Sequence, residues 1–200
     1  MIDQSNDELS PISSYLCDAV DSAAANIDAI SNQLSIACNM ITETLLNDHK
    51  LIICGNGHSA PIASLFTTCM MHQQEFERPS LPAINISIDS STISAIANDG
   101  NYHHIYSKQI RAIGNSGDTL IALSIDGNCS NIVQAIQTAH EKEINVVTLI
   151  GFVNGNISAV KYGDDIEVQL SATSVARAME SQLFAVNAMC HQIESQLFGG

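Results

Sequence analysis

Residues 51–71 constrain the fold of this chain more than any other segment. The segment begins with a short apolar run, residues 51–54, which is typical of a strand buried on both faces of a parallel sheet. Glycine and polar residues interrupt the run at residues 55–59, where Ser59 is the expected N-cap of a following helix. Such a turn favours anion binding, because the first helical amides are unpaired and the helix dipole attracts negative charge. The alternative is an ordinary tight turn without a ligand.

The length and charge of the chain limit its class. Its 200 residues, 46% of them hydrophobic, are enough for one domain with its own core. The formal net charge is −14, from 7 Lys and Arg against 21 Asp and Glu, which argues against direct binding to nucleic acid or to anionic membranes. No apolar run reaches transmembrane length and the N-terminus lacks a basic region, so the sequence predicts neither a membrane span nor a signal peptide.

The cysteines indicate a reducing environment. All six are far apart in the sequence, none forms a C-x-x-C pair, and several lie in apolar runs. We therefore expect buried thiols in a cytoplasmic protein, with no disulfide, no metal site and no cofactor. The six are Cys17, Cys38, Cys54, Cys69, Cys129 and Cys190.

Strand and helix patterns alternate through the rest of the chain. Further strands are expected at residues 83–87, 119–124, 145–150 and 165–169, the last at an edge of the sheet. Helices are expected from Asp89 to just before Gly100, over residues 102–113, and from about 130 to 140. This order predicts an α/β fold with a five-stranded parallel sheet and helices on both faces.

Long apolar stripes mark the two ends of the chain. The first ten residues are polar and are expected to fray, but from Leu9 to Leu45 apolar residues recur every three or four positions. This stripe either breaks near Asn26 into a helical pair or continues as one long arm. A last helix from about Ser174 carries a near-heptad seam, and we expect both helices to pack in a bundle between subunits. Residues 1–48 then form the helical arm and residues 49–200 the α/β domain, together one structural unit.

The motifs resemble a known family over essentially the whole chain. GNGHS after the first strand and SIDGNCSNI after the third stand where the sugar isomerase (SIS) domain carries its two phosphate-binding turns. The segments FERPSLPAI, SAIAND, YSKQIRAIG and the terminal ESQLF are similar to one branch, which holds phosphoheptose isomerase and the DnaA initiator-associating protein. The resemblance implies a flavodoxin-like sheet, a homotetramer, and sites between subunits at the carboxyl ends of the strands.

The resemblance also locates the acid–base and metal-binding positions of the isomerase. The family carries histidine and glutamate on the helix after the first turn, where this chain has Leu65 and Cys69. It carries glutamine and histidine on the final helix, where this chain has Met179 and Asn187. Leucine and methionine cannot titrate and asparagine is not basic. We therefore expect no catalytic residue at these positions.

Phosphate binding is expected to be weak. The family's second turn reads serine-threonine-serine-glycine-asparagine-serine, whereas Asp126 here places a negative charge in that turn. The family also supplies a basic residue across the subunit interface, at a position where this chain has Gln73. The residues still suited to a small anion or sugar phosphate are Asn56, Gly57, Ser59, Ser124 and Asn128.

Three functions follow from this comparison. The first is a non-catalytic tetramer that regulates replication initiation by binding the initiator DnaA through Leu197 and Phe198, a pair that also stands at the end of the initiator-associating protein. Several copies in a tetramer would add avidity. The second is a phosphoheptose isomerase that uses other residues on sedoheptulose 7-phosphate, and the third is a sugar-phosphate sensor. We favour the first function because the chain has Asn187 and lacks the acid–base residues of the isomerase.

Overall fold

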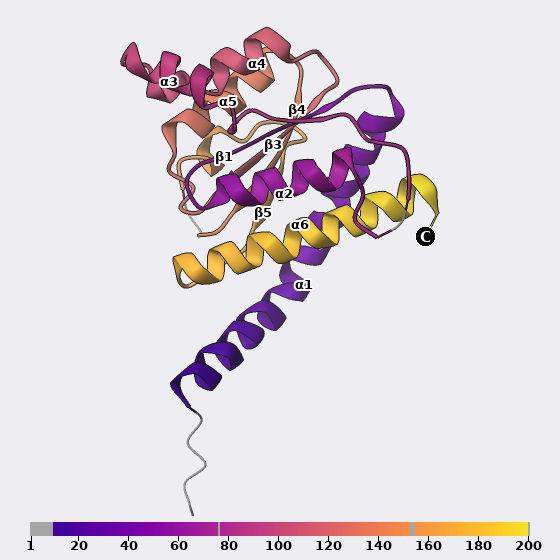
Figure 1. Cartoon of the computed structure of the whole chain (residues 1–200), viewed down its shortest axis with the longest axis vertical. Coiled ribbons are helices and arrows are strands. Elements are labelled where there is room, and N and C mark those ends of the chain that lie inside the picture. Colours follow the sequence, from indigo (N-terminus) through magenta and orange to yellow (C-terminus); the bar gives the residue numbers. More distant parts are fainter. Residues whose placement is uncertain (1–9, 76, 153–154, 200) are drawn as a thin grey trace, which may run out of the picture.

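A five-stranded parallel sheet forms the centre of the molecule. The computed structural model describes residues 10–75, 77–152 and 155–199. The strand order is β2-β1-β3-β4-β5 (Figure 1), which confirms the predicted α/β parallel sheet with β5 at an edge. The strands are β1 (Leu51–Gly55), β2 (Ala83–Asn85), β3 (Thr119–Ser124), β4 (Asn145–Ile150) and β5 (Ile166–Gln169).

Helices cover both faces of this sheet. Strand side chains alternate between two apolar clusters, as the two-residue period of a strand requires. One cluster lies under α1, α2 and α6, and the other lies under α4 and α5. The helices are α1 (Pro11–Leu46), α2 (Ser59–Met71), α3 (Ser90–Asn98), α4 (Ser107–Ile113), α5 (Ser130–Glu141) and α6 (Val175–Phe198), with 3-10 turns at Tyr102–His104 and Ser158–Val160.

Two predicted elements differ from those observed. The strand expected over residues 83–87 ends at Asn85, because the Asn85 side chain accepts the N–H of Ser87 and turns the chain. The helix expected over residues 102–113 is a 3-10 turn followed by α4. The side chain of Gln109, within α4, donates to the carbonyl of Ile105, which lies between the two.

The helix α1 is a single unbroken arm. It begins at Pro11, after the N-cap Ser10, and its 36 residues extend about 54 Å at 1.5 Å per residue. Its first half projects from the body of the molecule (Figure 1). The expected fraying of the first residues, and Leu9 at the start of the stripe, lie outside the described residues.

The two terminal helices, which we expected to pack in a bundle between subunits, also pack within the chain. In the second half of α1, Ala37 and Ile41 are fully buried against the chain's own sheet and α6. Val186 and Ile193 of α6 are buried in the same cluster. By contrast Ile12, Leu16, Val20 and Ile27 of α1 are exposed. No helix in the described part of the chain is long and apolar enough to cross a membrane.

Candidate functional site

The candidate site lies at the carboxyl ends of β1 and β3, the edge at which open α/β sheets bind ligands. The first turn, residues 55–59, joins β1 to α2, and the second turn, residues 124–129, joins β3 to α5. The two turns are neighbours because β1 pairs with β3, with Gly55 opposite Leu123. All five residues predicted to bind a ligand lie on these two turns.

The first turn presents unpaired backbone amides. Gly57 adopts φ = 49° and both it and His58 are exposed. Within the described residues, the N–H groups of Gly57 and His58 donate to no other group, whereas those of Ser59 and Ala60 bond to Asn56 and Gly57. These amides lie just ahead of the 13-residue α2, whose dipole favours negative charge at its N-terminus.

The Asn56 side chain is held by two neighbours that sequence analysis did not identify. Its amide exchanges two hydrogen bonds with the amide of Asn131, at 2.7 and 2.9 Å. The hydroxyl of Tyr106 donates to Asn56 Oδ1 and to the carbonyl of Gly55, both at 2.9 Å. Burial raises the pKa of Tyr106, so this hydroxyl is a permanent donor. Asn56 therefore fixes the position of the first turn.

Ser59 faces the interior rather than the surface of the turn. It is fully buried, and its Oγ donates to Gln182 Oε1 at 2.9 Å. It is the first residue of α2 and not its N-cap, because the helix starts one residue earlier than expected. The Gln182 amide also donates to the carbonyls of Ser124 and Leu149, at 3.0 and 3.1 Å. Through this side chain α6 is attached to the ends of β3 and β4.

The second turn is closed by its own carboxylate. Asp126 Oδ1 accepts the N–H of Asn128 at 3.0 Å, and Ser124 Oγ and Cys129 Sγ lie 3.4 and 3.5 Å from it. The Asn128 side chain is also engaged, since its Oδ1 accepts the N–H of Asn156 at 3.1 Å. Of the five predicted ligand residues, Gly57 contributes a backbone N–H without an acceptor among the described residues, whereas the side chains of the other four are engaged within the chain.

At the four positions compared with the isomerase, the side chains contact other parts of the chain. Leu65 and Met179 are half-buried against the cluster formed by α1, α2 and α6. Cys69 is buried next to Cys190, whose thiol pKa is raised by burial and then by Cys69. Asn187 accepts from Gln74 at 3.4 Å. Among the described residues no three His, Cys, Asp or Glu side chains are grouped to hold a metal.

The terminal pair also makes contacts within the chain. Leu197 packs against the same apolar cluster. Phe198 is 37% exposed, and its ring lies 5.8 Å from the guanidinium of Arg78. Arg78 in turn bonds Glu194 at 2.8 Å, with both side chains buried.

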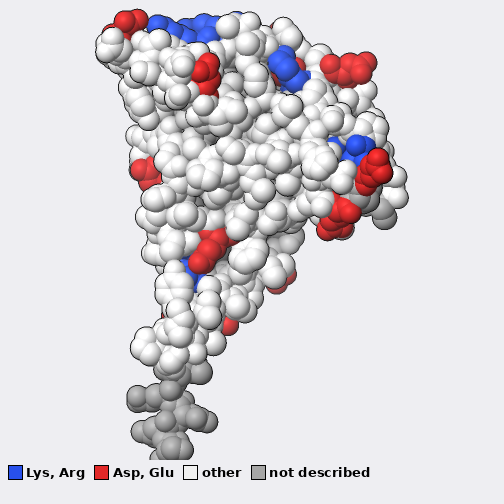
Figure 2. Space-filling view, in the orientation of Figure 1, with Lys and Arg blue, Asp and Glu red and all other residues white. Residues whose placement is uncertain are grey.

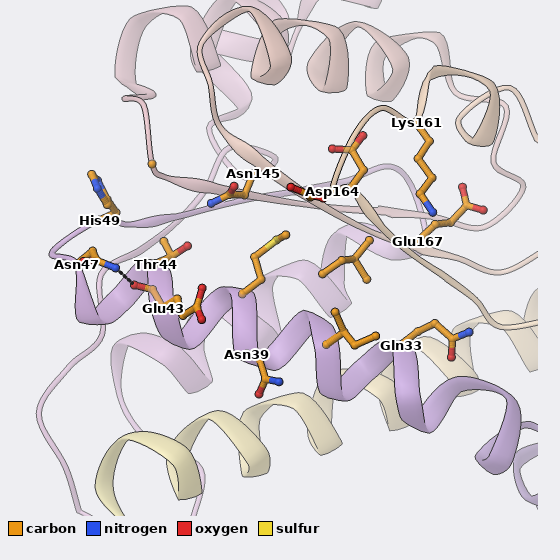
Figure 3. A pocket seen from close by; sticks show the side chains of 15 residues that line it. Gln33, Asn39, Glu43, Thr44, Asn47, His49, Asn145, Lys161, Asp164 and Glu167 are labelled. Carbon is orange, nitrogen blue, oxygen red and sulfur yellow. Dashed lines mark hydrogen bonds between the residues drawn. The ribbon is translucent and has the colours of Figure 1, made fainter.

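A large cleft lies at the opposite edge of the sheet. It has a volume of about 900 Å³ and is bounded by the end of α1 and the amino ends of β4 and β5. Figure 3 shows carboxylates of Glu43, Asp164 and Glu167 around it, with Lys161 and His49 as the basic side chains. These carboxylates oppose a phosphate, so the candidate site for an anion is the edge that carries the first turn.

Residues 14–151 match the model of the SIS domain. The chain belongs to this family. It is 42% identical to a phosphoheptose isomerase of Chromohalobacter salexigens over 83% of this chain and 84% of that protein. It is 38% identical to a phosphoheptose isomerase of Coxiella burnetii over 90% of both chains.

Solved structures give the same result. The structure of phosphoheptose isomerase from Neisseria gonorrhoeae matches with a TM-score of 0.86 and 30% identity, over 92% of this chain and 97% of that one. A phosphoheptose isomerase from Francisella tularensis matches with a TM-score of 0.88 and 32% identity, over 92% and 96%. The resemblance to the phosphoheptose isomerase-like family and its fold is thus confirmed.

The reading of the chain as a DnaA-binding regulator of replication is wrong. The relatives at 38–42% identity over most of the chain are named phosphoheptose isomerase, which was the alternative. The rejected hypothesis rested on the terminal pair Leu197 and Phe198 and on the loss of the isomerase's acid–base positions, including the one at Asn187. Asn187, Leu197 and Phe198 each make contacts within the chain.

Proposed function

We propose that this chain is a sugar-phosphate isomerase of the phosphoheptose type, which binds an open-chain sugar phosphate at the carboxyl edge of its sheet. The observation that carries the proposal is the open first turn, with the free amides of Gly57 and His58, in a chain 42% identical to a phosphoheptose isomerase. A phosphate there would receive backbone hydrogen bonds and the favourable dipole of α2.

Aldose–ketose isomerisation moves a proton between adjacent carbons, so it needs a base and a group that polarises the carbonyl. Leu65 and Met179 can do neither, and Asn187 can only donate or accept a hydrogen bond. The titratable side chains that this chain places on its two turns are His58, Asp126 and Cys129. We propose that one of these side chains carries out the proton transfer.

The test is incubation of the purified protein with sedoheptulose 7-phosphate, with and without added zinc, followed by NMR detection of the aldose phosphate. Conversion above a no-enzyme control supports the isomerase. Binding of the sugar phosphate without conversion supports the second candidate, a sugar-phosphate sensor, which is favoured by the apolar Leu65 and Met179. Absence of both binding and conversion contradicts both functions.

We also propose that copies of this chain associate into a homotetramer through α1 and α6. The first half of α1 exposes apolar residues, and a groove of about 330 Å³ between α1 and α6 is lined by apolar side chains such as Ile27, Phe184 and Ala188. Charged side chains are scattered over the face shown in Figure 2, most of which is uncharged. The exposed stripe and the groove suit helix-to-helix contact between copies.

The cysteines support a location in the cytoplasm. All six thiols are free, and Cys17 is exposed. Free thiols persist in a reducing compartment. We propose the cytoplasm as the site of action.

A further inference from the structure

The second turn directs several donors at a single point. Its Ser124 hydroxyl, Asn128 amide and Cys129 thiol all lie within 3.0–3.5 Å of one carboxylate oxygen of Asp126. Hydroxyl and amide donors arranged around one oxygen are what an anionic ligand requires. In this chain the anion is supplied by the protein itself.

The turn is built so that these donors keep their positions. Gly127 adopts φ = 70°, and its N–H donates to Ser124 Oγ at 3.0 Å. Its carbonyl accepts the N–H of Ile157 at 2.9 Å. A Cβ at Gly127 would lie 3.1 Å from both Gly155 Cα and an Ile150 methyl, so the backbone is closely packed. Gly127 therefore holds the backbone of the second turn in place.

The negative charge of Asp126 is not neutralised locally. Among the described residues, no Lys, Arg or His side chain lies within 4 Å of its carboxylate. A phosphate entering the second turn would meet this charge at close range. Repulsion between two charges about 4 Å apart at a protein surface corresponds to a loss of affinity of roughly tenfold or more.

We propose that Asp126 determines the ligand specificity of the site. Its carboxylate fills the anion position of the second turn, so the phosphate of a sugar phosphate binds at the first turn and the second turn receives uncharged hydroxyl groups. This assignment rests on the proposed binding of a sugar phosphate. It predicts that removal of one charge opens a position for phosphate that the wild-type chain lacks.

The test compares Asp126→Asn with the wild-type chain by calorimetric titration of inorganic phosphate and of sedoheptulose 7-phosphate. Asparagine keeps the oxygen that accepts the Asn128 N–H, so the turn is retained while the charge is removed. Asp164→Asn is the matched control, because Asp164 is an exposed aspartate at the opposite edge and its loss changes the net charge equally. Thermal unfolding of each variant shows whether it is folded.

We expect Asp126→Asn to bind inorganic phosphate about tenfold more tightly than the wild type, equivalent to about 1.4 kcal/mol, with Asp164→Asn unchanged. The inference alone is overturned if sedoheptulose 7-phosphate binds and Asp126→Asn gains no affinity for inorganic phosphate. An equal gain in Asp164→Asn also overturns it, since the effect would then come from net charge. If neither ligand binds any of the three proteins, both the inference and the proposed function fail.

Discussion

The hydroxyl of Ser59 donates to Oε1 of Gln182 at 2.9 Å, and both residues are fully buried. One lies at the start of α2 and the other in the middle of α6, 123 positions along the chain. Because the Gln182 amide also binds the carbonyls that end β3 and β4, a single side chain holds the ligand edge against the terminal helix. This contact holds the start of α2, and with it the first turn, in place.

Replacement of Gln182 by leucine should destabilise the protein. The Ser59 hydroxyl and the carbonyls of Ser124 and Leu149 would lose their partner while buried, so the free energy of unfolding should fall by about 2–4 kcal/mol. Urea denaturation measures this change. Gln137→Leu, at an exposed position of α5, should change the same quantity by less than about 0.5 kcal/mol. Equal effects of the two substitutions would remove the role given to Gln182.

The buried pair of Arg78 and Glu194 should be a second point of sensitivity. Both side chains are 1% exposed, and Glu194 also accepts the N–H groups of Gln74 and Glu75. Glu194→Gln leaves the guanidinium without its counter-charge and should cost about 3–5 kcal/mol. Glu141→Gln removes the carboxylate of an exposed ion pair to Arg111, and should cost less than about 1 kcal/mol in the same denaturation experiment.

Glu194 should also make the stability of the protein depend on pH. Burial raises the pKa of this carboxyl, but the Gln74 N–H, the Arg78 side chain and the Glu75 N–H outweigh it and hold the pKa below its usual value. A lowered pKa in the folded state means that its stabilisation is present above the unfolded value of 4.5 and is lost as the pH falls below it. The stability of Glu194→Gln should therefore fall less steeply below pH 4.5 than that of the wild type. Parallel curves would contradict this.

The proposed tetramer depends on the exposed half of α1. Val20 is 67% exposed on this helix, and an aspartate there should place a charge in the contact between copies and shift the protein to smaller species. Ile88→Asp is the control, because Ile88 is 65% exposed and lies ahead of α3. Sedimentation velocity distinguishes the species. A wild-type monomer, or a Val20→Asp protein that sediments as the wild type does, would be evidence against the proposal.

The central sheet could be predicted from the sequence because its signals are local. The strands at residues 119–124 and 145–150 each contain a run of apolar residues, and each was predicted over its observed residues. The helix start at Asp89 was also correct, since its side chain accepts the N–H groups of Ser91 and Thr92. Such capping depends on neighbours within three residues.

The orientation of the site residues could not be predicted in this way. Ser59 points inward because Gln182 reaches it from a distant helix, and no local pattern signals that contact. Asn131 and Tyr106 were missed for the same reason, since their roles depend on Asn56. The sequence showed a charge at Asp126, but only the fold shows that the donors of the second turn surround it.

The regulatory reading failed because it gave most weight to a few substituted positions. Leu65, Cys69, Met179 and Asn187 differ from the isomerase pattern, yet over 83–90% of its length the chain is 38–42% identical to proteins named phosphoheptose isomerase. A short terminal pair is weak evidence beside a match of that length.

The most direct test of the account is calorimetric titration of sedoheptulose 7-phosphate into the wild type, Gly57→Ala and Gly163→Ala. Both glycines have positive φ, at 49° and 57°, with nothing within 4 Å of an added Cβ, so alanine strains the two backbones to a similar degree. Only Gly57 lies beside the free amides of the first turn. We predict that the wild type and Gly163→Ala bind alike and that Gly57→Ala binds about tenfold more weakly. Equal binding by all three proteins, or no binding by the wild type, would contradict the account.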